Sequence, residues 1–352
     1  MNARFRSLVL FLWLACGGTA FAQGFAGLGT DAEGFAMPQP GHDFVFPQDH
    51  GAHPDFRIEW WYVTANLTGP DGTAYGLQWT LFRSALKPGE VDGWESPQVW
   101  FGHAAVTSAT MHEAAERFGR GGTGQAGVTA DPFEAWIDEW RMAGDLLGTV
   151  QLSATGASFA YEVTMRAKGP LIFHGQDGYS VKSAAGQASH YYSQPFFEVE
   201  GTLTLPDGDV PVRGSAWLDR EWSSQPLGEN QSGWDWFSLS FDDGDKLMGF
   251  RLRDTAGGGF TSATWIQPDG TTTSYADGKL VATPLETTAV AGRALPTRWR
   301  VTLEDRGLDV TVAALNGQSW MGLTIPYWEG PVSVTGSHDG RGYLEMTGYE
   351  EP

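Results

Sequence analysis

Short runs in which apolar and polar residues alternate dominate this chain from Ile58 onward. Turn signals separate the runs, and Asp-Gly pairs between apolar runs favour hairpins because glycine accepts the positive φ of a tight turn. These pairs lie at residues 71–72, 207–208, 243–244 and 269–270. The pattern predicts many short antiparallel strands. Helical spacing is moderate only over 111–118 and 133–147, where Trp136 and Trp140 would share one helix face.

An internal repeat supports the strand prediction. Each copy has an aromatic run, a Gly/Asp turn, an apolar run that ends in arginine, and a third apolar run. The matching segments are 60–66, 77–83 and 101–105 in the first copy and 234–240, 247–253 and 260–264 in the second. We interpret the repeat as two copies of one antiparallel β unit, each closing into a barrel. Chance similarity between Trp-rich hairpins is the alternative.

The repeat predicts two barrel domains, one over 43–195 and one over 196–352. The boundary rests on Pro195, which interrupts a strand, and on the new apolar run that starts at Phe196. Residues 23–42 are rich in Gly, Ala and Pro and are predicted to be a flexible lead-in. Barrels of this size have interiors able to hold an apolar ligand.

The amino terminus has the pattern of a secretory signal peptide over residues 1–22. Arg4 and Arg6 precede the apolar run 8–15, and an A-x-A cleavage pattern follows at 20–22. The run is shorter than the ~20 apolar residues that cross a bilayer. We therefore predict export to the periplasm. The alternative is a lipoprotein cleaved before Cys16 and anchored through it.

Composition narrows the possible functions. With 22 Lys+Arg against 42 Asp+Glu, the net charge of −20 argues against a nucleic-acid partner, which needs a basic face. Cys16 is the only cysteine, so cleavage of the signal peptide would remove disulfides and thiolate metal sites. No phosphate loop or nucleophile elbow is evident, and no cofactor or metal is predicted.

Five segments in a fixed order resemble the carotenoid 1,2-hydratase/AttH-type family of lipocalin-like proteins. They are 46–54 (FPQDHGAHP), 59–62 (EWWY), 190–193 (HYYS), 216–222 (AWLDREW) and 342–349 (GYLEMTGY). The resemblance runs from about Phe44 to Tyr349. It implies an all-β fold class with two tandem lipocalin-like antiparallel β-barrels, in agreement with the repeat.

The same resemblance implies several functions. The family contains carotenoid hydratases, cyclase-like fungal relatives and exported bacterial proteins, which are often encoded beside permeases of the lipoprotein-release type. This chain is most similar to the exported branch. Its Asp219-Arg220 pair departs from the Asp-His pattern associated with the hydratases.

Asp219 and Glu221 are the candidate catalytic residues, with His190 as a further candidate. Residues two apart on a strand share a face, so Trp217, Asp219 and Glu221 would point to one side. A carboxyl group desolvated in an aromatic cavity has a raised pKa and can protonate an alkene. The alternative is a buried ion-pair network of these two carboxylates with arginine. The arginines considered for that network are Arg57, Arg83 and Arg251.

Aromatic residues and histidines on the same strands are predicted to face a ligand. They are Trp61, His103, Tyr191, Tyr192, Trp217, Trp222 and Trp236. His103 or His190 can also shuttle protons near neutral pH. Trp60 and Trp61 are adjacent, so one should face a barrel interior and the other the boundary between domains. Glu59, Asp235 and Glu345 interrupt aromatic strands, and structural hydrogen bonding is their expected role.

Asp49, His50, His53 and Asp55 place four ligand types within seven residues. Gly51 and Pro54 make the segment a turn, and spacing alone does not show convergence on a metal. We expect the two histidines to be hydrogen-bonded loop residues that plug the mouth of the first barrel.

Three functions are consistent with these observations. The first is a periplasmic carrier of a hydrophobic, lipid-like or isoprenoid-like ligand, partnered with an ABC transporter permease of the lipoprotein-release type. The second is a hydratase or cyclase that acts on an isoprenoid alkene with Asp219 as general acid. The third is a structural adaptor whose barrels are filled by their own side chains.

Overall fold

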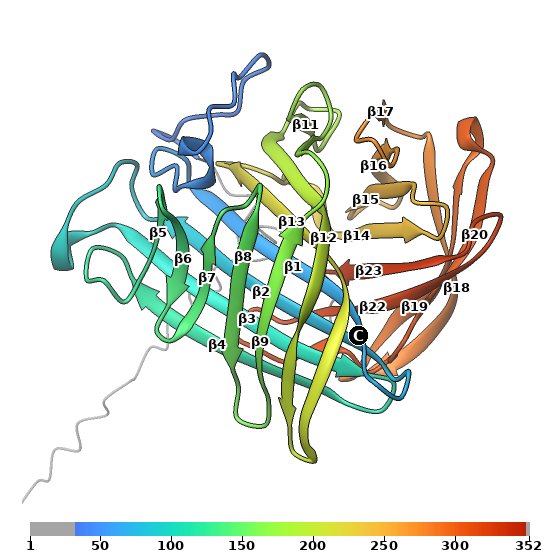
Figure 1. Ribbon diagram of the computed structural model, residues 1–352. Coiled ribbons are helices and arrows are strands. Elements are labelled where there is room, and N and C mark those ends of the chain that lie inside the picture. The colour runs from blue at the N-terminus through green and yellow to red at the C-terminus, as the bar shows by residue number, and fades with distance from the viewer. Residues whose placement is uncertain (1–31, 350–352) are drawn as a thin grey trace, which may run out of the picture.

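The computed structural model describes residues 32–349 as two antiparallel β-sheets (Figure 1). The predicted signal peptide and Cys16 lie outside the described residues. The first sheet contains β1 (Ile58–Thr68), β2 (Ala74–Ala85), β3 (Gln98–Ser108), β4 (His112–Arg120), β5 (Ala126–Ala130), β6 (Phe133–Ile137), β7 (Trp140–Gly144), β8 (Thr149–Thr155), β9 (Ala160–Ala167), β10 (Ile172–Phe173), β11 (Tyr179–Val181), β12 (Ala188–Leu205) and β13 (Gly208–Ser223).

The second sheet contains β14 (Gln231–Phe241), β15 (Lys246–Asp254), β16 (Gly259–Ile266), β17 (Thr272–Tyr275), β18 (Leu280–Val290), β19 (Arg293–Leu303), β20 (Leu308–Ala314), β21 (Trp320–Met321), β22 (Tyr327–Gly336) and β23 (Gly340–Met346). The short 3-10 helices in the described residues are η2 (Gln48–His50), η3 (Gly93–Glu95) and η4 (Glu304–Arg306). Within residues 32–349, no helix has the length and apolar character needed to cross a bilayer.

The first sheet runs β4-β3-β2-β1-β13-β12-β9-β8-β7-β6-β5 and curls into a nearly closed barrel, while the second forms a half-barrel (Figure 1). This confirms the predicted all-β fold class. The repeat also has the expected topology, because β1–β2–β3 and β14–β15–β16 are both antiparallel meanders.

Side-chain alternation divides the buried hydrophobic residues into three large groups and a small fourth one of Ala105, Met321 and Tyr327. Trp61 and its inward-facing neighbours fill the first barrel, and Trp299 and its neighbours fill the second. A third group, which includes Tyr62, Tyr191 and Trp236, lies between the two sheets. The protein's own side chains thus occupy much of both interiors, and ligand binding there stays a prediction.

Two segments with a moderate helical pattern are strands instead. Residues 111–118 belong mostly to β4, and residues 133–147 form the hairpin β6–β7. Phe133, Ala135 and Ile137 alternate toward the core, which is the period of a strand. Asp138 has a φ of 50° and forms a tight hairpin turn, so Trp136 and Trp140 do not share a helix face.

The change of sheet comes later along the chain than the predicted domain boundary. β12 runs through residues 195 and 196 and pairs with β13 on both sides of a bulge between Gln194 and Phe197. The chain passes from the first sheet to the second only between Ser223 and Gln231.

Glycine allows close packing between the sheets and across the first barrel. A Cβ atom on Gly76 would lie 2.5 Å from the hydroxyl of Tyr343 and 2.6 Å from Pro331, both on the second sheet. A Cβ atom on Gly102 would lie 2.9 Å from Ile137, so its absence lets the β6–β7 hairpin pack on β3. Larger side chains at either position would separate these layers.

Candidate functional site

A small, partly open cavity lies where the two sheets meet. Its volume is about 70 Å³. It is lined by Trp60, Tyr62, Lys182, Tyr191, Asp219, Glu221, Pro226, Leu227, Trp234, Trp236, Phe250, Leu252 and Glu345. β1, β12 and β13 supply one wall, and β14, β15 and β23 supply the other.

Asp219 is the central polar group of the first wall and is only 2% exposed. Its carboxylate accepts hydrogen bonds from Trp217 Nε1 at 2.6 Å, from Tyr191 Oη at 2.8 Å and from Ser193 Oγ. Burial raises the pKa of Asp219 to about 7, although these hydrogen bonds oppose the shift and the charge of Glu221 adds to it. The group therefore exchanges a proton near neutral pH.

Further hydrogen bonds fix the donors around Asp219. Tyr191 Oη accepts from Trp236 Nε1 at 3.1 Å. His174, which is fully buried, has Nε2 2.6 Å from Ser193 Oγ and Nδ1 3.0 Å from a threonine hydroxyl on β16. Burial lowers the pKa of His174 well below its ordinary value, so the imidazole is neutral and orients the serine hydroxyl.

Glu221 carries the second carboxylate of this wall and forms an ion pair inside the cavity. Lys182 Nζ lies 2.8 Å from Glu221 Oε1, and Ser189 Oγ also donates to that carboxylate. The ammonium group sits over the rings of Tyr191 and Phe250 at 4.8 and 4.3 Å from their centroids. Lys182 thus balances the charge of Glu221 and leaves Asp219 without a cationic partner.

The opposite wall holds one carboxyl group, Glu345, and a second one, Glu329, lies beside it on β22. Glu329 and Glu345 are directly opposite each other on β22 and β23. Trp234 Nε1 donates to Glu345 at 2.8 Å, and Tyr62 Oη donates to Glu329. Burial raises the pKa of Glu345 to about 7, and Asp219 adds to this shift. Burial and the neighbouring Glu345 raise the pKa of Glu329 well above its ordinary value.

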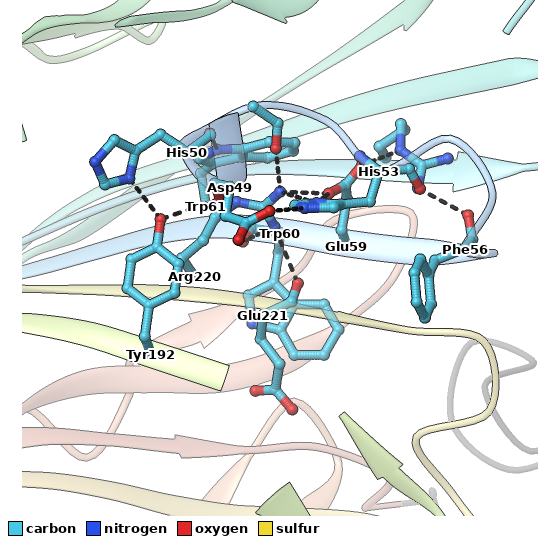
Figure 2. Close-up of polar contacts among 12 residues, drawn as sticks. Asp49, His50, His53, Phe56, Glu59, Trp60, Trp61, Tyr192, Arg220 and Glu221 are labelled. Carbon is cyan, nitrogen blue, oxygen red and sulfur yellow. Dashed lines mark hydrogen bonds and ion pairs between the residues drawn. The ribbon is translucent and has the colours of Figure 1, made fainter. Parts of the chain in front are cut away.

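A different polar network closes the mouth of the first barrel, and we call it the barrel-mouth cluster: Asp49, His53, Glu59, Arg83 and Arg220. Figure 2 labels all of these residues except Arg83. Glu59 is completely buried and accepts hydrogen bonds from both arginines and from His53 Nδ1 at 3.1 Å. His53 Nε2 lies 3.1 Å from Asp49. Burial raises the pKa of Glu59, but the positive charges of Arg83 and Arg220 stabilise its carboxylate more strongly. The pKa of Glu59 therefore lies well below its ordinary value.

Aromatic rings enclose this cluster. The Arg220 guanidinium lies 3.8 Å from the ring centroid of Trp61, and His53 stacks on Trp222 at 3.9 Å. His50 Nδ1 lies 2.7 Å from the hydroxyl of Tyr192 (Figure 2). The loop 46–54 thus plugs the barrel mouth through hydrogen bonds. Within residues 32–349, no group of three or more His, Cys, Asp or Glu side chains could hold a metal ion.

The predicted site residues of the first sheet divide between its two faces, and Trp236 comes from β14 of the second sheet. The residues that line the cavity or bond a carboxyl group there are Asp219, Glu221, Tyr191, Trp217 and Trp236. The residues that lie on the barrel side are Trp61, Tyr192, Trp222 and His190. These four residues do not line the cavity, because a strand sends adjacent residues to opposite faces, and their predicted role toward a ligand stays a prediction. Burial lowers the pKa of His190 to about 4.

His103 also lies away from the cavity, between β3 and β22, where Nδ1 is 3.0 Å from Tyr327 Oη. The alternative of an arginine network around the cavity carboxylates is wrong for Glu221, which pairs with Lys182. Arg83 pairs with Glu59, and Arg251 lies 4.0 Å from Asp235.

Two residues that line the cavity, Lys182 and Tyr62, and one beside it, Glu329, were not predicted from the sequence. Lys182 comes from the segment before β12 and carries no motif that distinguishes it from a surface lysine. Tyr62 follows a Trp pair and is identifiable only by counting strand alternation from Trp61. Glu329 lies in an aromatic strand, as Glu345 does, and a polar residue in such a strand was the available signal.

Comparisons with known proteins extend over nearly all of these elements. The AttH-like family model matches residues 37–349. A crystal structure described as an AttH protein from Nitrosomonas europaea is 32% identical, with a TM-score of 0.80, and covers 90% of this chain and 100% of its own. No curated protein sequence gives a significant match.

Two more distant structures share the fold. Kievitone hydratase from Nectria haematococca is 14% identical, with a TM-score of 0.66, over 90% of this chain and 98% of its own. CghA in complex with Sch210972 is 13% identical, with a TM-score of 0.52. The match covers 92% of this chain and 98% of the CghA chain. The family match spans the barrel-mouth cluster, both cavity walls and both sheets, and the chain belongs to the AttH-like family.

Proposed function

We propose that this protein is an acid catalyst that hydrates or cyclises a small alkene of isoprenoid type, with Asp219 as the general acid. The observation that carries the proposal is a buried carboxyl group whose pKa is raised to about 7, set in a cavity walled by indole and phenyl rings. General acids work best when their pKa is near the working pH.

The cavity residues fit the charge changes of such a reaction. Asp219 donates its proton to one alkene carbon, and the other carbon becomes a tertiary cation. The ring faces of Trp60, Trp236 and Phe250 stabilise the cation, and such contacts are worth up to about 2 kcal/mol when desolvated. Water then adds and gives up its surplus proton to a cavity carboxylate, which leaves a tertiary alcohol. Alternatively, a second double bond closes a ring, and the ring cation loses a proton to that carboxylate. Glu221 offsets the charge of Lys182, which would otherwise oppose the cation.

The size of the cavity favours chemistry on one end of a molecule over the carriage of a whole lipid. At roughly 10–15 Å³ for each water-sized position, about 70 Å³ holds about five to seven heavy atoms, comparable to one prenyl unit. Sites that enclose a whole small molecule are typically about 300–1,000 Å³, so this cavity fits one end of a ligand better than a whole one. The filled barrels also give less support to the carrier hypothesis. Export and a permease partner stay predictions from the sequence.

The test is turnover of short prenyl compounds by the wild type and by Asp219→Asn, followed by mass spectrometry in isotopically labelled water. The amide keeps an acceptor for Trp217 and Ser193 but cannot supply the proton. We expect turnover to fall by about 10²–10⁴-fold while circular dichroism stays unchanged. Asp207→Asn, in the exposed β12–β13 turn, is the matched control. Undiminished turnover in Asp219→Asn would remove the assignment.

A further inference from the structure

His103 is a buried titratable group that the proposed reaction does not yet use. It is 0% exposed, and the rings of Phe82, Phe101 and Tyr327 surround it. Both ring nitrogens are engaged, Nδ1 with Tyr327 Oη at 3.0 Å and Nε2 with Glu116 Oε1 at 3.1 Å. Aromatic rings do not relay protons, so a proton can reach or leave His103 through Tyr327 or through Glu116.

On the inner side, these contacts lead to the cavity. Tyr327 lies two residues before Glu329 on the same face of β22, so its hydroxyl is a neighbour of that carboxyl group, and Tyr62 Oη donates a hydrogen bond to Glu329. Glu345, directly across from Glu329, lines the cavity. Two facing carboxyl groups buried together cannot both ionise readily, so the pair retains a proton.

On the outer side, the contacts lead to solvent. Glu116 on β4 is partly exposed, and its carboxylate accepts from Thr324 Oγ1 at 2.8 Å and from Thr324 N at 3.2 Å. Burial raises the pKa of Glu116, but hydrogen bonds from His103 and Thr324 lower it below its ordinary value. A carboxylate at the surface can therefore pass protons to water.

We propose that Glu345, Glu329, Tyr327, His103 and Glu116 form a proton path from the cavity to the surface along the junction of the two sheets. In the resting state, neutral His103 donates from Nε2 to Glu116 and accepts the Tyr327 hydroxyl at Nδ1. When Glu329 gives a proton to the Tyr327 oxygen, the phenol proton passes to Nδ1, and the Nε2 proton passes to Glu116.

The path would remove the proton that the proposed hydration releases, so its role rests on the proposed function. When water adds to the substrate cation, its surplus proton goes to the Glu345–Glu329 pair and leaves through Tyr327 and His103. Asp219 regains a proton from solvent after product release. The net change is one alkene plus one water to one alcohol, with one proton entering at Asp219 and one leaving at Glu116.

Infrared spectroscopy of the substrate-free protein tests the path directly. Protonated buried carboxyl groups give C=O bands that shift when the protein is moved rapidly into D₂O. Glu345→Gln and Glu329→Gln assign the band of the pair. We expect Tyr327→Phe, which removes only the hydroxyl, to slow deuterium exchange of that band by at least tenfold. The Asp219 band is an internal control and should exchange at the wild-type rate.

Tyr343→Phe is the matched variant, because Tyr343 is buried at the same junction but lies outside the path. It should leave exchange of the pair unchanged. If Tyr327→Phe does not fold, Glu116→Gln at the exposed end should still slow exchange. If the carboxyl band of the pair exchanges at the wild-type rate in Tyr327→Phe, or in a folded Glu116→Gln, the path is wrong. The path is also wrong if the wild type has no carboxyl band that Glu345→Gln removes. Because no substrate is present, these outcomes are independent of whether Asp219 catalyses hydration.

Discussion

Two buried carboxyl groups on the same sheet behave in opposite ways. Glu59 in the barrel-mouth cluster is 0% exposed and Asp219 in the cavity is 2% exposed. Burial pushes the pKa of each upward, yet the pKa of Glu59 ends well below its ordinary value and that of Asp219 rises to about 7. The difference is the neighbours. Glu59 contacts Arg83 and Arg220, whereas the hydrogen bonds to Asp219 come from uncharged donors.

One strand creates both environments. In β13, Arg220 points into the first barrel, and Asp219 and Glu221 on either side of it point to the cavity. The cation nearest to Asp219 in sequence is therefore committed to Glu59 on the far face. Strand alternation lets a single tripeptide stabilise a permanent carboxylate on one side and keep an exchangeable proton on the other.

Removing Arg220 should have the largest effect on stability. Arg220→Met keeps an apolar side chain between Trp61 and Trp222 but leaves Glu59 with less compensating charge. Removing one partner of a buried ion pair typically lowers the free energy of unfolding by about 3–5 kcal/mol, because the other charge stays buried without compensation. We expect a loss of this size in the free energy of unfolding, measured by urea denaturation.

A surface pair provides the contrast for that experiment. Arg298 Nη1 lies 3.0 Å from Glu286, and both side chains are about half exposed or more. Arg298→Met should cost less than about 1 kcal/mol. Equal losses for the two variants would mean that Arg220 does not stabilise a buried charge.

The cavity carboxyl predicts an unusual pH dependence. Because the folded pKa of Asp219 is raised from 3.8 to about 7, the folded state binds its proton more tightly than the unfolded state does. This stabilisation is complete below about pH 4 and is lost as the pH rises to about 7. Asp219→Asn lacks the titration, so its stability relative to the wild type should increase between pH 4 and pH 7, by at most about 4 kcal/mol.

Chemical denaturation at pH 4, 5, 6, 7 and 8 measures this difference. Asp207→Asn, in an exposed turn, should show no such slope. Glu59 contributes with the opposite sign, because its lowered pKa gives stability that is lost only as the pH falls below about 4.5. A flat difference between Asp219→Asn and the wild type would mean that folding does not raise the pKa of Asp219.

The all-β fold could be predicted from local signals. Alternation and the Asp-Gly turns mark strands such as β1 and β2, and the repeated aromatic segments mark the two meanders. The boundary at Pro195 was less predictable, because a bulge lets β12 continue past the proline and pair with β13 on both sides. The pattern over 133–147 failed for a similar reason, since Asp138 turns the chain within an apparently helical spacing.

The site was predictable only where one strand defines it. Counting alternation from Asp219 places Glu221 and Trp217 correctly, but it also shows that Trp222 belongs to the other face. Glu329 reaches the cavity region from a strand more than a hundred residues away. Contacts of that kind depend on how the two sheets pack, which no local pattern specifies.

The smallest effects should come from matched indole replacements in the two regions. Trp61→Phe removes a hydrogen bond of 2.9 Å to the His50 carbonyl, and Trp236→Phe removes one of 3.1 Å to Tyr191. Each loss should cost about 1 kcal/mol in addition to the change in side-chain volume. Only Trp61 also supports a guanidinium, that of Arg220, at 3.8 Å. Trp61→Phe should therefore be the more destabilising by about 0.5–1 kcal/mol in thermal unfolding; the reverse order would show that packing outweighs the cation contact.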